Sequence, residues 1–320
     1  MAPDSTRKLV NKSARAFAPA TVSNVGPGFD LMGFPVFGIG DEVEVKPNGT
    51  GASRITAIHG NTSLSTAIDE NTAGKAIKSF LLENAPNEGV DIILYKNMPI
   101  GSGMGSSAAS AVAGVVAVNA LLKEPLPPEK LINYALDGEL IASGTRHGDN
   151  IIPSLMGGFI LITDTEKFEF IKIDPPTNLV VMLIHPHIVI NTKQARAILP
   201  DMIPTKDSIQ QTSAAMMLLT GLLKNDFNLI SAASKDFIAE PYRSKLIPGY
   251  HEMKKLFLAN GACAFNVSGS GPTSFGFFNS EQAAKKLRNI VIANYKNLNI
   301  EVDISLSKVN NQGSKVLEIL

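Results

Sequence analysis

In the first part of the chain, apolar and polar positions predict two strands, a helix and a third strand. The segment SARAFAPATVSNVG is strand-like and breaks at Gly26, Pro27 and Gly28, and the segment after it ends in the strict alternation EVEVKP. In TAGKAIKSFLLENA the apolar residues recur at helical spacing, with Asn71 or Thr72 as the expected N-cap. The apolar run VDIILYKNMP then predicts a buried strand that leads directly into a segment rich in glycine and serine.

The rest of the chain alternates predicted helices with short apolar strands. A helix is expected from about Ser106 to Leu122 and another in PPEKLINYALDGELIAS. In SGTRHGDNIIPSLMGGFILI we expect a loop, a short apolar segment and a strand. LVVMLIHP predicts a strand, and ACAFNVSGSGPTSFGFF has a second glycine-serine turn between two apolar runs. The remaining expected elements are helices in QTSAAMMLLTGLLK, DFNLISAAS, HEMKKLFLANG and SEQAAKKLRNIVIANYK and a strand in IEVDISLS.

The length of the chain and the paired prolines in IDPPTN predict two domains. A chain of 320 residues exceeds the usual size of a single hydrophobic core, which favours two domains of α/β or α+β class. We expect a loose N-terminal arm over residues 1–13, a first domain over 14–174 and a second over 175–320. The composition, 44% hydrophobic and 18% charged, is typical of a globular protein and excludes a disordered chain or a fibre.

Charge and cysteine content narrow the classes of partner. The 29 Lys and Arg residues equal the 29 Asp and Glu residues, so no overall field draws the chain to nucleic acid or to a membrane surface. A single cysteine, Cys263, excludes an internal disulfide and favours a reducing compartment, which we take to be the cytoplasm. No apolar run approaches the roughly 18 to 20 residues of a membrane-spanning helix, and the N-terminus lacks the apolar core of a signal peptide. We therefore expect small-molecule partners.

The segment PIGSGMGSSAAS, between a predicted strand and a predicted helix, allows three interpretations. It is a flexible connector, a tight turn that packs closely, or a phosphate cradle in which backbone N–H groups and a helix N-terminus face the anion. A helix end contributes only about 0.3 to 2 kcal/mol toward an anion, so a triphosphate also needs several N–H groups and a metal. Ser106 and Ser107 place hydroxyls at the helix start, where one can face Mg²⁺. The glycine spacing fits neither a dinucleotide-binding loop nor a Walker A loop nor a nucleophile elbow.

The longer segment MPIGSGMGSSAA closely resembles the phosphate loop of the GHMP kinases, which include galactokinase, homoserine kinase and mevalonate kinase. Two further segments resemble the other motifs of these kinases, in the same order along the chain. The resemblance implies ATP and Mg²⁺ as cofactors and an α+β, two-domain GHMP kinase fold. Its N-terminal domain would be of the ribosomal S5 domain 2-like type and its C-terminal domain ferredoxin-like. The ATP-binding residues so implied are Pro99, Ile100, Gly101, Ser102, Gly103, Met104, Gly105, Ser106, Ser107 and Asn71.

The N-terminal segment APATVSNVGPGFDLMG resembles the homoserine kinase form of the first motif, in which Asn24 and Asp30 hold the amino-acid substrate. A carboxylate suits an ammonium group, and an amide beside it both accepts and donates hydrogen bonds. The same two residues also fit a structural role in the Gly-Pro-Gly turn. Asn71 likewise fits an ordinary helix start as well as a position near the purine.

The segment GELIASGTRHGDN resembles the part of the family that carries a metal-binding glutamate and, eight residues later, a substrate-binding histidine, here Glu139 and His147. Mg²⁺ takes few protein carboxylates, so Glu139 with Ser107 suffices as a metal site. Taken alone, the glutamate also fits a solvated helix position and the histidine a structural one. Asn150 is expected to orient the substrate hydroxyl, with Asp149 as the candidate if a base takes part.

Two arginine-containing segments complete the resemblance. NTKQARAILP gives Thr192 and Arg196, and AEPYRSKLIP gives Arg243. Two guanidinium groups that converge on one carboxylate suit an amino-acid substrate, although each arginine alone also fits a surface charge. FNVSGSGPTSFGF resembles the third motif, whose glycine turn packs beside the phosphate loop and includes Gly269 as a substrate-binding residue. The catalytic residues implied by the resemblance are Asn150, Glu139, Ser107 and Thr192.

The motifs together imply transfer of the γ-phosphoryl group of ATP to the side-chain hydroxyl of L-homoserine, which gives O-phospho-L-homoserine in threonine biosynthesis. Positioning and charge neutralisation supply most of the catalysis in such a reaction. Two alternatives remain: another small-molecule kinase of the same superfamily, and a non-catalytic ligand sensor on the same fold. A dinucleotide oxidoreductase is disfavoured by the glycine spacing. Relatives often dimerise, so a homodimer is a further expectation.

Overall fold

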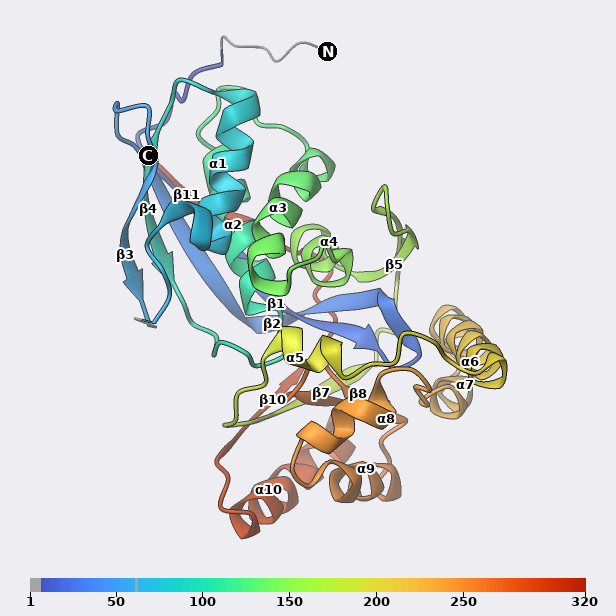
Figure 1. The fold of residues 1–320 in the computed structure, drawn as a ribbon. Helices are drawn as coiled ribbons and strands as arrows, with labels where there is room; N and C mark the ends of the chain where they lie inside the picture. Colours follow the sequence, from blue (N-terminus) through green and yellow to red (C-terminus); the bar gives the residue numbers. More distant parts are fainter. Residues whose placement is uncertain (1–6, 61–62) are drawn as a thin grey trace.

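Two sheets organise the chain and meet near its middle (Figure 1). The computed structural model describes residues 7–60 and 63–320. Within these residues a seven-stranded sheet carries most of the N-terminal part and a four-stranded sheet carries the C-terminal part. The short helix α5 (Thr192–Ala197) lies where the two parts meet.

The first sheet has the strand order β11-β1-β2-β4-β3, with β5 paired to β2 and β6 paired to β5. All its neighbours are antiparallel except β3 and β4, which are parallel. Because β2 is 20 residues long, it pairs with β4 near its end and with β5 near its start. The strands are β1 (Ala14–Val25), β2 (Gly28–Pro47), β3 (Arg54–His59), β4 (Val90–Tyr95), β5 (Phe159–Asp164), β6 (Glu169–Ile173) and β11 (Lys315–Ile319).

Four helices pack against this sheet and against one another (Figure 1). The second, α2, consists mostly of alanine, valine, serine and glycine, and nearly all of its residues are buried. A Cβ added at Gly114 would lie only 3.2 Å from Cδ1 of Ile77, so small residues are what let the helices approach closely. This packing fixes where the N-terminus of α2 points. The helices are α1 (Thr72–Asn84), α2 (Ser106–Asn119), α3 (Ile132–Ser143) and α4 (Gly148–Met156).

The second sheet has the order β10-β7-β9-β8 and is antiparallel throughout. Counted along the chain, its strands lie in the order 4-1-3-2, with helices in the two long connections, which is the ferredoxin-like arrangement. This agrees with the C-terminal fold implied by the sequence. Its strands and packed helices are β7 (Val180–Pro186), α9 (Tyr250–Ala259), β8 (Ala264–Val267), β9 (Ser274–Phe278), α10 (Glu281–Asn297) and β10 (Val302–Ser307).

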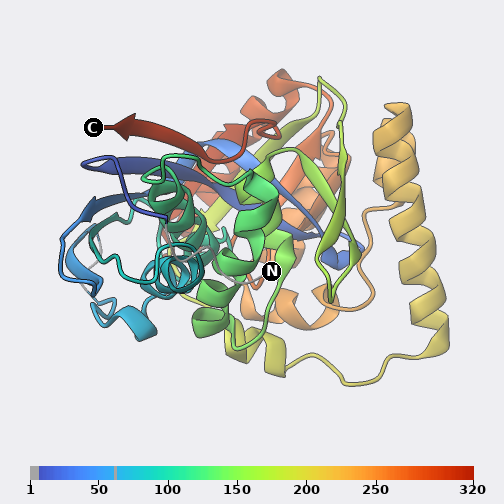
Figure 2. The ribbon, with the colours of Figure 1, turned by 90° about the horizontal axis from the view of Figure 1, so that it is seen from above.

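The connection between β7 and α9 carries the remaining helices: α5, α6 (Thr205–Lys224), α7 (Phe227–Ala232) and α8 (Glu240–Arg243). Figure 2 shows α6 standing at one edge of the molecule. Single 3₁₀ turns cover Ile68–Glu70, Pro128–Leu131 and Ser244–Leu246.

Aromatic side chains join the two sheets. The Phe34 ring on β2 stacks on Phe159 with 5.6 Å between ring centroids, and it meets Phe275 and Phe277 of the second sheet at 6.1 and 5.7 Å. Because these rings are fully buried, the two sheets share one apolar contact region. A separate apolar cluster, with Tyr250 among its largest members, lies between the second sheet and α9 and α10.

The helices and strands expected from the sequence are present, with differences at α4 and α2 and with five further elements, β3, β6, α5, α8 and β11, that the pattern did not predict. A nine-residue helix, α4, occupies the segment for which a loop and a short apolar run were expected, although Pro153 lies inside it. Its buried face includes Ile151, Ile152 and Leu155, so packing outweighs the poor helix propensity. In addition, α2 ends at Asn119 rather than Leu122, and the final strand β11 had no counterpart in the pattern.

The C-terminal strand returns to the first sheet, where β11 pairs with β1. The division of the chain at 174 and 175 stays a prediction, and the last residues of the second segment lie in the sheet of the first. Of the expected N-terminal arm, residues 1–6 lie outside the described residues, while the backbone N–H of Val10 donates to the Leu121 carbonyl at 2.9 Å. Within residues 7–60 and 63–320, no helix combines the length and apolar character needed to cross a membrane.

Candidate active site

A cavity of about 420 Å³ opens where the first sheet, α2 to α5 and the second sheet come together. Most residues that the sequence singled out line it. Pro99 and Met104 are not among the lining residues: Pro99 is exposed, and Met104 is buried with its carbonyl bonded to the Thr21 N–H at 3.0 Å. The predicted residues that do line it are Asn24, Asp30, Asn71, Ile100, Gly101, Ser102, Gly103, Gly105, Ser106, Ser107, Glu139, His147, Asn150, Thr192, Arg196, Arg243 and Gly269.

The glycines between β4 and α2 are required by the backbone. Gly101, Gly103 and Gly105 have φ of 66°, 76° and 66°, in the left-handed region that side chains other than hydrogen rarely allow. They are required by packing as well, since a Cβ at Gly103 would lie 2.6 Å from the Ser268 carbonyl oxygen. The interpretation of this segment as a tight, closely packed turn is therefore confirmed.

The same loop also ends in a helix N-terminus that faces the cavity. Gly105 is the N-cap of α2 and offers no side-chain cap, and the first intrahelical bond runs from the Ala109 N–H to the Gly105 carbonyl at 2.8 Å. The N–H groups of residues 106–108 precede that bond, as in every helix. Because Ser106 and Ser107 line the cavity, these donors and the positive end of the helix dipole suit an anion there.

The second glycine turn, between β8 and β9, is bonded directly to the first. Ser268 Oγ donates to the Gly103 carbonyl at 2.7 Å, and the Thr273 N–H donates to the Ser102 carbonyl at 3.1 Å. The Gly269 N–H donates to the Ser23 carbonyl at 3.0 Å. The third motif thus packs beside the phosphate loop, as expected, and ties both to the β1–β2 turn.

A buried ion pair that the sequence analysis did not predict is bonded to the glycine loop between β4 and α2. Lys96, at the end of β4, contacts the Asp41 carboxylate, and its Nζ donates to the Ser106 carbonyl at 3.0 Å and to Ser110 Oγ at 2.7 Å. Asp41 Oδ1 accepts from the N–H groups of residues 97 and 98 at 2.9 and 3.1 Å. Burial lowers the pKa of Lys96, and Asp41 opposes that shift. We name Asp41 and Lys96 the loop clamp, because together they bond both ends of the loop.

Glu139 on α3 has the character of a metal ligand. Its side chain is buried in the cavity wall, and its Oε2 has no hydrogen-bond partner among the described residues. Burial raises its pKa to about 7, while a hydrogen bond from Ser107 opposes the shift. A buried carboxylate oxygen without a partner, beside a serine hydroxyl and an anion cradle, suits a hard divalent cation such as Mg²⁺. No cluster of three or more His, Cys, Asp or Glu side chains is present in 7–60 and 63–320, so any such ion needs oxygens from a ligand or water.

The opposite end of the cavity holds an exposed ion pair. Asp30 Oδ1 and Oδ2 accept from the two terminal nitrogens of Arg196 at 2.8 and 2.7 Å. The Arg196 guanidinium also lies over the Phe29 ring at 4.9 Å, and Arg243 lies over the same ring at 5.3 Å. Phe29, to which no role was assigned in the sequence analysis, therefore contacts both arginines.

Arg243 is the buried member of the arginine pair. Its Nη1 donates to the Gly269 carbonyl at 2.8 Å and its Nε to the Ala195 carbonyl at 3.3 Å. Burial lowers its pKa, and the Asp30 carboxylate opposes that shift. The hydrogen bonds of Arg196 to Asp30 raise the pKa of Arg196. Both arginines line the same end of the cavity, and the carboxylate near them belongs to Asp30 of the chain itself.

The amide and carboxyl groups between the two ends are held by hydrogen bonds. Asn150 Oδ1 accepts from Thr21 Oγ1 at 2.6 Å, and its Nδ2 donates to Ser23 Oγ at 3.0 Å. Burial and the Asp30 charge raise the pKa of the neighbouring Asp149 to about 7. Asn24 Oδ1 accepts from the Asp30 N–H at 2.8 Å, so the structural role in the turn is real while both residues also line the cavity.

The other predicted residues complete the wall. Asn71 is the N-cap of α1, with Oδ1 accepting from the N–H groups of residues 73 and 74, and it lines the cavity as well. Thr192 begins α5, with its Oγ1 3.4 Å from Ser270 Oγ. His147 Nδ1 lies 3.9 Å from Asp30 Oδ1, and burial lowers the pKa of its imidazole.

Known proteins resemble this chain along nearly its whole length. Residues 71–158 match the model of the GHMP kinases N terminal domain, and residues 218–297 match GHMP kinases C terminal. Homoserine kinases from Chlorobium phaeobacteroides and Chlorobaculum tepidum are 38% and 37% identical; each match covers 96% of this chain and 100% and 98% of the relative. The chain belongs to the homoserine kinase family. The crystal structure of a homoserine kinase from Cytophaga hutchinsonii superposes with a TM-score of 0.92 at 40% identity, over 97% of this chain and 99% of that one.

Membership of this family confirms the resemblance seen in the sequence and the two-domain GHMP kinase fold. The loop clamp and Phe29 are the parts of the site that the motifs did not mark. A signal for the clamp existed, since Lys96 is a charged residue directly after an apolar strand and close before the glycine loop, but nothing along the chain links it to Asp41. Phe29 stands inside the first motif, where only its neighbours Asn24 and Asp30 were weighed.

Proposed function

We propose that this member of the homoserine kinase family transfers the γ-phosphoryl group of ATP to the side-chain hydroxyl of L-homoserine and releases ADP and O-phospho-L-homoserine, in threonine biosynthesis. The observation that carries the proposal is that one cavity holds both an anion cradle and a carboxylate flanked by two guanidinium groups. The first suits a polyphosphate, and the second suits a zwitterion.

The nucleotide would bind at the α2 end of the cavity. Its phosphates would accept hydrogen bonds from the N–H groups of the glycine loop and of the first turn of α2, beginning at Ser106. Asn71, which also lines the cavity, would lie near the purine. The loop clamp bonds both ends of the loop through the chain's own groups, so little reorganisation would be needed.

Glu139 and Ser107 are the residues that would hold Mg²⁺, and the unpartnered Oε2 of Glu139 supports this assignment. The ion, when bound, supplies neutralisation of the charge on the phosphates. Burial raises the pKa of Glu139 to about 7, because a charged carboxylate is poorly stabilised there. A bound cation would stabilise the ionised form. We expect Glu139→Gln to raise the Mg²⁺ concentration required for half-maximal rate.

The amino acid would bind at the α5 end by exchange with the exposed ion pair. Its ammonium group would take the place of Arg196 beside Asp30, and its carboxylate would then bind Arg196 and Arg243. Phe29 already stacks both guanidinium groups, so they move little when their partner changes. Gly269, His147 and Thr192 line this end as further contacts.

The transfer step forms a bond between the homoserine hydroxyl oxygen and the γ-phosphorus and breaks the bond from that phosphorus to the β,γ-bridging oxygen, which leaves with ADP. Asn150 would orient the hydroxyl, because hydrogen bonds to Thr21 and Ser23 fix its amide. If a base takes part, Asp149 would be the group that takes the hydroxyl proton. Burial raises its pKa to about 7, near the value at which a base works best at neutral pH.

The decisive experiment is mass detection of the phosphorylated product from purified protein, ATP, Mg²⁺ and L-homoserine. We expect a gain of one phosphoryl group on homoserine and one ADP per product. A panel of other hydroxyl acceptors, including mevalonate and galactose, tests the alternative of another GHMP kinase. ADP formation that favours a different acceptor would overturn the proposed substrate, and no ADP with any acceptor would favour a ligand sensor.

We also propose the cytoplasm as the site of action and a homodimer as the assembly. The lone cysteine, Cys263, is buried and unpaired, which suits a reducing compartment. Fractionation of cells with an antibody to the chain tests the compartment, and recovery with a membrane or secreted fraction would contradict it.

A further inference from the structure

One buried amide on α6 bonds two segments that lie far apart in the chain. Gln211 is only 6% exposed, although α6 stands at one edge of the molecule (Figure 2). Its Nε2 donates to the Pro27 carbonyl at 2.8 Å and to Asp236 Oδ1 at 3.1 Å. Its Oε1 accepts from the Phe237 N–H at 2.7 Å. The side chain therefore bridges the β1–β2 turn and the loop that leads into α8.

The attachment of α6 to the molecule does not require this amide. Leu218 and Leu222 of the same helix are buried in the main apolar core, together with Ile230 of α7. Apolar contacts of this kind hold a surface helix by themselves. Burial of an amide costs free energy unless its hydrogen bonds are made, so a role for Gln211 has to come from the two segments that it bonds.

The first segment is the β1–β2 turn, which carries the carboxylate at the α5 end of the cavity. Asn24 and Asp30, on either side of Pro27, have positive φ of 54° and 57°, which residues other than glycine rarely adopt. Such conformations persist only where the surrounding structure holds them. The bond from Gln211 to the Pro27 carbonyl is one such restraint, three residues before Asp30 in the chain.

The second segment leads into α8, the single helical turn that ends at Arg243. The Asp236 carboxylate accepts from the N–H groups of residues 238, 239 and 240 at 2.8 to 3.2 Å, which fixes the start of that turn. The Arg243 N–H in turn donates to the Ala239 carbonyl at 2.9 Å. Gln211 thus bonds the residue that holds the helix of the buried guanidinium group.

From these contacts we infer that Gln211 is a positioning residue, which sets the distance between Asp30 and Arg243 and thereby selects ligands with an ammonium group and a carboxylate on one carbon. The inference rests on the proposed function, in which the two side chains bind the two charges of the amino acid. Gln211 is not among the residues that line the cavity, so it acts through the segments that it bonds. These segments also meet at the cavity, where Arg243 lies over the Phe29 ring at 5.3 Å.

The test compares ligands that carry two charges with ligands that carry one. L-homoserine has both charges, 4-hydroxybutyrate lacks the ammonium group, and 3-aminopropanol lacks the carboxylate. Gln211→Met keeps the length of the side chain and removes its hydrogen bonds. We expect it to weaken homoserine binding about tenfold or more, because a displacement of about 1 Å suffices for such a loss, and to change binding of either single-charge ligand about twofold or less. Ligand-observed NMR titration of the full chain without ATP measures all three.

The matched control is Gln210→Met, the same substitution at the exposed neighbouring position of α6, which leaves all three affinities unchanged. A second variant, Gln211→Asn, has an amide that is one methylene too short to bond both segments, and we expect it to act in the same direction as Gln211→Met. ATP binding by each variant should match that of the native chain, because the bonds of Gln211 lie outside the glycine loop. It therefore reports that the variant is folded.

The outcomes separate this inference from the proposed function. A native chain that binds homoserine no more tightly than the single-charge ligands overturns the proposed acceptor, and this inference with it. A native chain that prefers homoserine, together with a Gln211→Met variant that loses affinity for all three ligands equally or for none, overturns the inference alone. A loss confined to homoserine in both Gln211 variants supports it.

Discussion

The two ends of the active-site cavity are built in opposite ways. At the α2 end, glycines in left-handed conformations pack against backbone, and the loop clamp is almost fully buried, with 3% and 0% of the Lys96 and Asp41 side chains exposed. At the α5 end, Asp30 and Arg196 satisfy each other on the surface, with 24% and 44% of their side chains exposed. The first end is held by the chain's own buried groups, whereas a zwitterion at the second end would have to replace the pairing of Asp30 with Arg196.

This contrast reflects what each end would bind. A polyphosphate needs many fixed N–H donors, and rigid backbone supplies them with little reorganisation. A zwitterion needs two opposite charges held apart. Asp30 and Arg196 supply two such charges and pair with each other. Breaking an ion pair at the surface costs little free energy. Four sets of substitutions test the contrast, in decreasing order of expected effect.

The largest effect is expected at the loop clamp. Lys96→Met leaves Asp41 as an uncompensated buried charge, and removal of one partner of a buried pair costs about 3–5 kcal/mol of the free energy of unfolding. Denaturant unfolding measures the loss, and kinetics should show KM for ATP rising more than KM for homoserine. The double variant Asp41→Asn with Lys96→Met serves as control and should be less destabilised than Lys96→Met alone. Equal losses in both would remove the electrostatic argument.

At the α5 end of the cavity, the two arginines are expected to affect only the binding of the acceptor, homoserine. Arg243→Ala should weaken homoserine binding by about 2–5 kcal/mol, the usual loss when one partner of a buried charge pair is removed, and Arg196→Ala should weaken it as well. Arg243 is the more buried of the two, so its loss should be the larger. Calorimetric titration with ATP and with homoserine measures the effects separately. An arginine variant with unchanged homoserine turnover would contradict the carboxylate role.

Alanine substitution of two glycines with nearly the same φ distinguishes the effect of backbone conformation from the effect of packing at the glycine loop. Gly105→Ala puts a Cβ 2.2 Å from Thr21 Oγ1 and 2.7 Å from Asn150 Oδ1, and overpacking of this kind costs about 1–3 kcal/mol. Gly49→Ala is the matched control, because its φ of 67° is nearly the same as the 66° of Gly105 and nothing lies within 4 Å of the added Cβ. We expect Gly105→Ala to lower both stability and ATP affinity, as thermal shift and titration measure. If both variants behaved alike, packing of the loop would not matter.

The smallest effect is a pH dependence of stability at Asp149. Burial raises its folded-state pKa to about 7, so between its ordinary pKa and about 7 the folded state binds a proton that the unfolded state has lost. Stability therefore falls as pH rises through this range, and the loss is complete above about 7. Without ligand, Asp149→Asn should raise Tm by about 2–4 °C at pH 8 relative to the native chain and not at the acidic end of the range.

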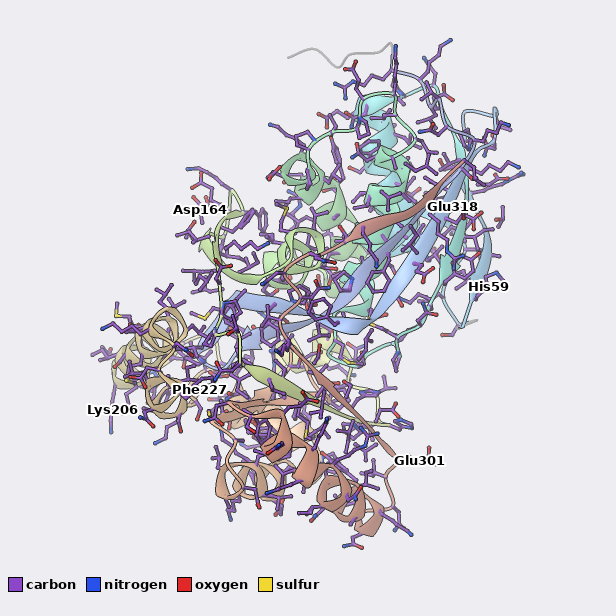
Figure 3. The ribbon with its side chains drawn as sticks, turned by 180° about the vertical axis from the view of Figure 1, so that it is seen from behind. His59, Asp164, Lys206, Phe227, Glu301 and Glu318 are labelled. Atoms are coloured by element: carbon purple, nitrogen blue, oxygen red, sulfur yellow. The ribbon has the colours of Figure 1, made fainter. Side chains whose placement is uncertain are left out.

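The control for Asp149 is Asp164, a carboxylate whose pKa is lowered rather than raised. The N–H groups of Lys167 and Glu166 lower the pKa of Asp164, which lies at the end of β5 with 30% of its side chain exposed and is labelled in Figure 3. Its contribution to stability is present at neutral pH and is lost as pH falls through its folded-state pKa. Asp164→Asn should therefore show no gain in Tm at pH 8. A gain there would mean that the pH effect is not specific to burial.

Local pattern was sufficient for most of the secondary structure and for the position of the glycine loop between β4 and α2. The alternation in EVEVKP and the helical spacing before Asn84 depend on neighbours along the chain, and so do the glycines that precede Ser106. It was not sufficient for α4, where packing of Ile151 and Ile152 outweighs Pro153. Nor did it reveal β11, which exists because β1 offers an open edge.

What the sequence determined by itself is which residue types stand next to one another: the glycine run, its two serines, and the motifs that place the chain in its family. Only the tertiary structure decided which distant residues meet, as in the pairing of Asp41 with Lys96 and of Asp30 with Arg196. The reason is physical. Backbone conformation is set by local sterics, whereas burial, and the pairing of charge that burial requires, depends on the packing of segments far apart in the chain.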